Sequence, residues 1–113
     1  MKIVEDKISL EEIKKIARDT FGKLVKAVVD IEKEIMAIGG ELHSDEEAEL
    51  LKRGSKQESL WGINIYPDEA EQDWIEFDSV INLRPTSGNF SRGVDSPQMR
   101  EKIKAIIDKL ILR

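Results

Sequence analysis

The chain of 113 residues contains no cysteine and only one histidine. Without cysteine there is no disulfide, no thiolate ligand for a metal and no cysteine nucleophile, which excludes several classes of enzyme and of secreted domain. No stretch approaches the roughly 18 apolar residues of a membrane span. The N-terminus carries acidic residues in place of the apolar run of a signal peptide. We therefore expect a soluble, cytoplasmic protein without a membrane partner.

Basic residues are fewer than acidic residues. Lysine and arginine total 18 against 23 aspartate and glutamate, which gives a net charge of −5 and a pI near 5.0. Broad binding to nucleic-acid backbones requires a basic field, so we do not expect it, although a small local basic patch is compatible with these totals. Asparagine and glutamine are scarce, and lysine and glutamate supply most of the charge, a composition typical of thermophilic proteins.

The remaining composition is that of a globular protein, with 40% hydrophobic and 36% charged residues. This length falls in the commonest size range of single domains. We therefore expect one domain over residues 1–113 with one core.

A capping box marks the start of a first helix at Ser9, with Glu12 as its reciprocal partner. Apolar residues then recur at the spacing of a helix with one buried face. They are Leu10, Ile13, Ile16, Ala17 and Phe21. Gly22 is expected to end this helix in the left-handed conformation.

A second capping box at residues 44–47 predicts a short helix over 45–53. Ala48 and Leu51 would face inward, and Gly54 would stop the helix. Ser96-Pro97 then provides the start of a closing helix, whose apolar stripe continues to the C-terminus.

Residues 24–31 are rich in β-branched side chains and predict a strand. Residues 34–38 would return antiparallel after a turn at Glu32-Lys33, and Glu41-Leu42-His43 would continue that strand past a glycine kink. The turn lacks an Asn-Gly or Asp-Gly signature, so a continuous helix over 24–38 is the competing interpretation.

Two further strands are predicted at residues 60–67 and 74–83, because apolar and polar side chains alternate in both. Residues 2–8 alternate loosely and suit a short edge strand or an extended lead-in. The resulting order, α-β-β-α-β-β-α, predicts an α+β fold of two layers. About four mostly antiparallel strands would carry three helices on one face.

Three strings of the sequence are distinctive: Gly40-Glu41-Leu42-His43, Leu60-Trp61-Gly62-Ile63-Asn64-Ile65-Tyr66-Pro67 and Ile81-Asn82-Leu83-Arg84-Pro85. Through them the chain resembles a small family of uncharacterised archaeal and bacterial proteins of this length, over most of its extent. That family has no assigned activity, so the resemblance implies neither a function nor catalytic residues.

The loop at residues 84–94 is the strongest candidate for a site. Arg84 and Arg92 offer planar donor forks for a phosphate or carboxylate, and Ser87, Asn89 and Ser91 add hydroxyl and amide groups. We predict that these five residues capture a small anionic ligand. The alternative is a hydrogen-bonded surface loop in which Arg84 pairs with a carboxylate. The loop does not match the phosphate-binding P-loop motif.

His43 supports a second hypothesis, a small hydrolase or nuclease. The histidine would act as general base and Arg84 or Arg92 would stabilise developing charge, which requires these side chains to lie at the same edge of the sheet. Alternatively, His43 is structural or simply exposed. No metal site and no cofactor is expected, because the acidic segments 45–49 and 68–73 lack the spacing of a calcium loop.

A third hypothesis is a structural homodimer that forms through an exposed face of the sheet. Trp74 and Val80 would lie at the contact between the two copies.

Overall fold

The computed structural model describes residues 1–113 and contains three α-helices, as predicted. The helices are α1 (Leu10–Asp19), α2 (His43–Lys52) and α3 (Pro97–Leu110). The strands are β1 (Lys2–Val4), β2 (Ile8–Ser9), β3 (Val25–Asp30), β4 (Ile35–Ile38), β5 (Leu60–Ile65), β6 (Ile75–Glu76) and β7 (Ile111–Leu112). Short 3₁₀ turns are η1 (Gln57–Ser59), η2 (Val80–Asn82) and η3 (Pro85–Ser87). The α+β class is confirmed.

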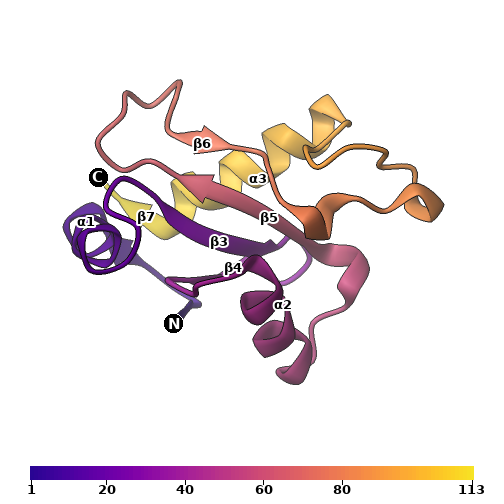
Figure 1. Cartoon of the computed structure of the whole chain (residues 1–113), viewed down its shortest axis with the longest axis horizontal. Helices are drawn as coiled ribbons and strands as arrows, with labels where there is room; N and C mark the ends of the chain where they lie inside the picture. The colour runs from indigo at the N-terminus through magenta and orange to yellow at the C-terminus, as the bar shows by residue number, and fades with distance from the viewer.

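The main sheet has five strands in the order β1-β4-β3-β5-β6, and every neighbouring pair is antiparallel (Figure 1). It therefore has one strand more than predicted, because residues 2–4 pair with β4 as an edge strand. A separate parallel pair, β2 with β7, joins the two ends of the chain. Residues 111–112 thus leave the helix that was expected to continue to the C-terminus.

Helices cover both faces of the sheet, so the prediction of helices on one face is wrong. Val25, Ala27 and Val29 of β3 pack in the large core cluster with residues of α1 and α3, whereas Val28 packs with Leu50 of α2 on the other side. The physical reason is the connection from β4 to β5. β4 and β5 both flank β3 and run in the same direction, so α2 crosses between them over the second face.

The predicted hairpin of β3 and β4 is confirmed, and Asp30 explains how it forms without a glycine turn. Its Oδ1 accepts the backbone N–H groups of Glu32 and Lys33, each at 2.9 Å. Glu34 then takes the left-handed conformation, with φ 56°. The turn spans the four residues 31–34, in place of the tight turn expected at Glu32-Lys33, and the side chain of Asp30 holds it in shape.

The first helix begins as predicted, with the Ser9 hydroxyl accepting the Glu12 N–H at 3.1 Å. Gly22 takes the left-handed conformation just past its end. The placement of Phe21 on the buried face is wrong, since the helix ends at Asp19 and Phe21 is 47% exposed. Its ring instead lies 5.1 Å from the ammonium of Lys26.

The second helix begins two residues earlier than predicted and presents a different face. Leu42 is its N-cap residue and makes no side-chain cap, so the 44–47 capping box does not form and residues 41–43 do not extend β4. Glu46 and Leu50 are buried, whereas Ala48 and Leu51 are exposed. Glu46 turns inward because its Oε2 accepts the N–H of Gly40 at 3.0 Å. The end of the helix before Gly54 is as predicted.

The predicted strand over 74–83 is wrong beyond its first residues, because β6 spans only Ile75–Glu76. The chain then leaves the sheet and forms the turn η2. Ser79 caps the start of this turn, because its hydroxyl accepts the N–H of Ile81. The closing helix starts as predicted, with the Ser96 hydroxyl capping Met99 and Pro97 in the first position. None of the helices is both long and apolar enough to cross a membrane.

Candidate functional site

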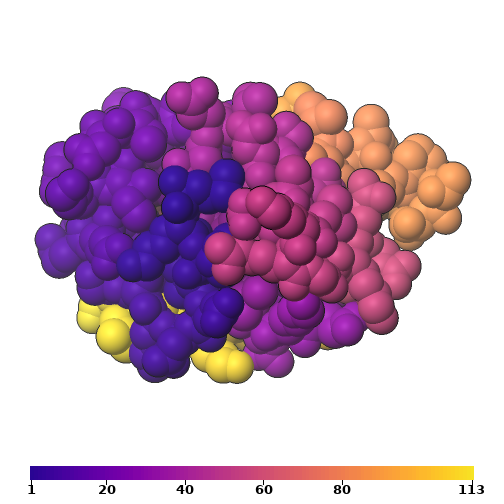
Figure 2. Space-filling model, turned by 90° about the horizontal axis from the view of Figure 1, so that it is seen from below, coloured from indigo at the N-terminus to yellow at the C-terminus, as the bar shows by residue number.

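The segment from η2 to α3 forms a lobe at one end of the molecule, visible in orange in Figure 2. Arg84 and Asn89 pair antiparallel across it, with hydrogen bonds of 2.9 and 3.1 Å between their backbone groups. Asn89 is buried, and its Nδ2 donates to the carbonyls of three loop residues: Asn82, Ser91 and Gly93. Its Oδ1 accepts the N–H of Asp95 at 2.8 Å. The Asn89 side chain therefore holds the loop in shape.

Two other predicted residues are engaged with carboxylates. The Ser91 hydroxyl donates to Asp95, and this bond, followed by the Phe90 N–H, lowers the pKa of the Asp95 carboxyl. Arg92 forms an ion pair with Asp78, with 2.8 Å between Nε and Oδ1. Both contacts are exposed to solvent; the first lies within the lobe, and the second joins the lobe to the segment that precedes η2.

Arg84 is different, because it takes part in no ion pair. Its terminal nitrogens donate to the backbone carbonyls of Gln57 at 2.6 Å and Leu60 at 2.7 Å, and the guanidinium lies 4.2 Å from the centre of the Trp61 ring. Burial lowers the pKa of this half-buried arginine. Its Nε is buried without a hydrogen-bond partner. The carbonyls satisfy N–H groups but carry no charge, and the Glu47 carboxylate, which opposes the effect of burial, acts from a distance without forming an ion pair with Arg84.

A polar groove opens beside Arg84, with a volume of about 450 Å³. Residues 84–87 form one wall with Arg84, Thr86 and Ser87, and residues 56–58 form the other with Lys56, Gln57 and Glu58. We call it the Arg84 groove. The structure thus brings Arg84 and Ser87 together, and it separates them from Arg92. Sequence reasoning missed Lys56 and Thr86, because no local pattern signals that residues 56–58 lie beside the loop.

His43 is the first residue of α2 and lies over β5, where its Nε2 is 2.8 Å from the carbonyl oxygen of Ile63. Burial lowers the pKa of its imidazole, and the Asp78 carboxylate opposes that effect. Arg84 is anchored at Leu60, three residues away along the same strand, or about 10 Å. The Asp78 carboxylate, which pairs with Arg92, therefore acts on His43, while Arg84 lies in a separate groove. No three acidic or histidine side chains are placed to hold a metal ion.

The apolar side chains that are exposed differ in part from those expected at a dimer contact. Trp74 is only 2% exposed, and the guanidinium of Arg113 covers its ring at 4.3 Å, so its expected place on an exposed face is wrong. Val80 is exposed as expected, and it is joined by Leu83 and by Phe90, which is 70% exposed.

The fold and the groove define a small α+β protein with an antiparallel sheet covered on both faces and a polar groove at one end. The chain belongs to the family described as "Protein of unknown function (DUF5674)", whose model matches residues 2–110. Membership of an uncharacterised family is thereby confirmed. No curated protein and no solved structure matches the chain.

Proposed function

We propose that this protein is a binding module that takes an anionic group, a phosphate or a carboxylate, in the Arg84 groove. The observation that carries the proposal is the half-buried guanidinium of Arg84, which donates to two backbone carbonyls and makes no ion pair with a carboxylate. Charges withdrawn from water are normally paired, because losing hydration is costly. An incoming anion would supply the missing counter-ion.

The donors that remain suit such a ligand. One N–H on each terminal nitrogen of Arg84 is left after the bonds to Gln57 and Leu60, and guanidinium forks bind phosphate or carboxylate in a bidentate manner. The hydroxyls of Thr86 and Ser87 make no hydrogen bond within the protein and line the same groove. Stacking on Trp61 already orders the guanidinium, which reduces the entropy lost on binding.

The remaining residues of the predicted anion site have supporting roles in this proposal. Asn89 fixes the loop that carries Arg84 and Ser87. Ser91 and Arg92 stabilise the lobe through Asp95 and Asp78. The ligand therefore contacts the 84–87 end of the loop. Lys56, whose ammonium lies 3.7 Å from the Glu32 carboxylate, joins from the opposite wall.

Hydrolysis has less support than binding. His43 is about 10 Å along β5 from the anchor of Arg84. Its Nε2 is engaged with a backbone carbonyl, and burial disfavours its protonated form. A general base must lie within hydrogen-bond reach of the proton that it removes, and this spacing of the two anchoring carbonyls gives no support for such a contact between His43 and a ligand held by Arg84.

A homodimer is the second candidate, favoured by the exposed apolar side chains of Val80, Leu83 and Phe90. The Arg84–Asn89 pairing places Leu83 opposite Phe90 in the next cross-strand position. A second copy would bury these side chains through the same surface on both subunits.

Thermal unfolding with inorganic pyrophosphate, at constant ionic strength, tests the anion site. We expect stabilisation that grows with concentration and reaches about 2.7 kcal/mol at a hundred times Kd. A triple variant, Lys56→Gln with Thr86→Val and Ser87→Ala, should lose most of it, because it removes an ammonium and two hydroxyls that line the groove. These exposed changes leave the anchors of Arg84 intact. Arg92→Gln is the control and should retain it. Undiminished stabilisation of the triple variant would exclude the Arg84 groove.

A further inference from the structure

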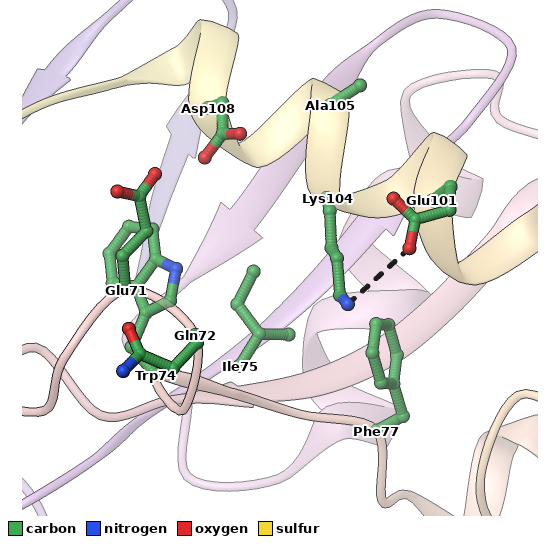
Figure 3. A pocket seen from close by; sticks show the side chains of 9 residues that line it. All are labelled: Glu71, Gln72, Trp74, Ile75, Phe77, Glu101, Lys104, Ala105 and Asp108. Carbon is green, nitrogen blue, oxygen red and sulfur yellow. Dashed lines mark ion pairs between the residues drawn. The ribbon is translucent and has the colours of Figure 1, made fainter.

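A second groove lies between the 71–77 segment and α3 and has a volume of about 350 Å³ (Figure 3). We call it the β6–α3 groove. Its lining residues are Glu71, Gln72, Trp74, Ile75, Phe77, Glu101, Lys104, Ala105 and Asp108. In Figure 3 the side chains of Ile75 and Phe77 rise from the strand segment toward the helix. With Trp74, they give the groove an apolar floor.

The wall of the groove is acidic. Glu101, Lys104 and Asp108 lie on one stripe of α3 at three- and four-residue spacing. With Glu71 they supply three carboxylates and one ammonium, a net charge of −2. Lys104 pairs with Glu101 at 3.6 Å, whereas Glu71 and Asp108 form no ion pair and lie at the same end of the groove in Figure 3. The groove is therefore complementary to positive charge.

The strand beside the groove has an edge that is open at Ile75, and the 92–93 segment lies beside the chain only from Phe77 onward. β6 is the last strand of the sheet, and the backbone N–H of Tyr66 donates to the Trp74 carbonyl at 2.7 Å. This register also makes Asn64 and Glu76 a hydrogen-bonded pair, so the N–H and C=O of Ile75 point away from β5. No hydrogen bond outside the strands uses them. An unpaired strand edge is a template for another extended chain.

We propose that the β6–α3 groove docks an extended, basic segment of a partner protein, which adds to the sheet beside β6. The backbone of the segment pairs with Ile75, and its alternate side chains enter the groove. The apolar stems of lysine or arginine lie over Ile75 and Phe77, and their charged ends reach Glu71 and Asp108. The outward N–H and C=O of Ile75 favour a peptide over a free organic amine, which has no backbone to pair with them.

A fluorescently labelled peptide of alternating lysine and valine, acetylated and amidated at its ends, tests this docking by fluorescence anisotropy. We expect saturable binding that weakens as salt is added. A matched peptide with glutamate in place of lysine should not bind. In a spectrum of the ¹⁵N-labelled protein, the largest shifts should fall on Trp74, Ile75 and Glu76.

Charge variants separate this groove from general attraction to an acidic protein. Glu101→Lys with Asp108→Lys should weaken binding at least tenfold. The control, Glu41→Lys with Asp45→Lys, makes the same change in net charge on exposed residues at the α2 side of the sheet, and it should bind with less than a twofold change. Equal losses in both variants, or none in the first, would overturn the proposal.

Backbone methylation tests strand addition itself. Methylating the amide nitrogens at alternate residues of the peptide, in each of two frames, removes the N–H groups on one edge at a time. Binding should be lost in one frame and retained in the other. Equal effects in both frames would refute strand addition. Competition by pentane-1,5-diamine at the same concentration as unlabelled peptide would assign the groove to a free amine instead.

Discussion

The side chain of Asn82 takes the place of a neighbouring strand for Gly62. Its Oδ1 accepts the Gly62 N–H at 2.8 Å, and its Nδ2 donates to the Gly62 carbonyl at 2.9 Å. The approach is close, since a Cβ on residue 62 would lie 2.5 Å from the Cβ of Ser79. One amide side chain therefore completes the hydrogen bonding of β5 where β6 has already ended.

Replacing Asn82 with alanine should destabilise the fold by about 2–4 kcal/mol, because it leaves the buried N–H and C=O of Gly62 without partners. The free energy of unfolding from urea denaturation measures the loss. Gln72→Ala, which removes an exposed amide, is the control and should change it by less than about 0.5 kcal/mol. Similar values for the two variants would show that Asn82 does not complete the strand.

Asp30 should contribute as much as Asn82 to the stability of the fold, because its buried carboxylate accepts hydrogen bonds from three donors. They are the N–H groups of Glu32 and Lys33 and the hydroxyl of Ser55, which donates at 2.6 Å. Asp30→Ala should cost about 2–4 kcal/mol in the free energy of unfolding, whereas Asp30→Asn should cost less because it keeps an acceptor for the turn. Urea denaturation of both variants checks the order. An equal cost would assign the loss to the charge and not to the hydrogen bonds.

Local signals in the sequence predicted the fold wherever one residue acts on its near neighbours. Ser9 and Ser96 cap their helices as expected, and alternating β-branched residues identified β3. The same logic failed at α2 and β6. There the outcome depends on partners elsewhere in the fold, since Glu46 binds the amide of Gly40 and Asn82 binds the backbone of β5.

The candidate site was predictable only in part, for the same reason. The loop could be recognised from its composition, but nothing near Arg92 in sequence indicates that Asp78, fourteen residues away, neutralises it. Likewise, the burial of Trp74 beneath Arg113 depends on the packing of the C-terminus. Sequence alone therefore could not say which of the two loop arginines, Arg84 and Arg92, forms an ion pair.

Glu58 lines the Arg84 groove and should oppose an anion there. Glu58→Gln should therefore tighten pyrophosphate binding by about fivefold, which corresponds to about 1 kcal/mol, the interaction of two unit charges about 4 Å apart in water. Isothermal titration calorimetry measures the two Kd values. Glu41→Gln removes an equal charge from outside the groove and should leave Kd within a factor of two. If Glu58→Gln has no larger effect than this control, the ligand does not enter the groove.

A substitution of Phe90 tests the proposed homodimer. If two copies meet through Val80, Leu83 and Phe90, then Phe90→Ser should shift the mass measured by sedimentation equilibrium toward the monomer, because it removes the most exposed of these apolar side chains. Phe21→Ser, an equivalent change at another exposed phenylalanine, should leave the mass unchanged. A wild-type chain that sediments as a monomer at high concentration would contradict the dimer directly.

Glu46 should make the stability of the protein fall as pH rises. Its side chain is 0% exposed, and burial raises the pKa of its carboxyl to about 9 from a usual value of 4.5. Between these values the folded state keeps a proton that the unfolded state has released, so the free energy of unfolding decreases by up to about 1.4 kcal/mol per pH unit. Below pH 4.5 both states hold the proton and the effect vanishes.

Urea denaturation of the wild type and of Glu46→Gln at several pH values between 5 and 8 isolates this effect. Glutamine keeps an oxygen for the Gly40 N–H and does not titrate, so the difference in unfolding free energy between the two proteins should change steadily in favour of the variant as pH rises. Glu41→Gln, at an exposed position, should show no such trend. A difference that stays constant with pH would mean that Glu46 is ionised in the folded protein, and that the interior around Gly40 stabilises its charge.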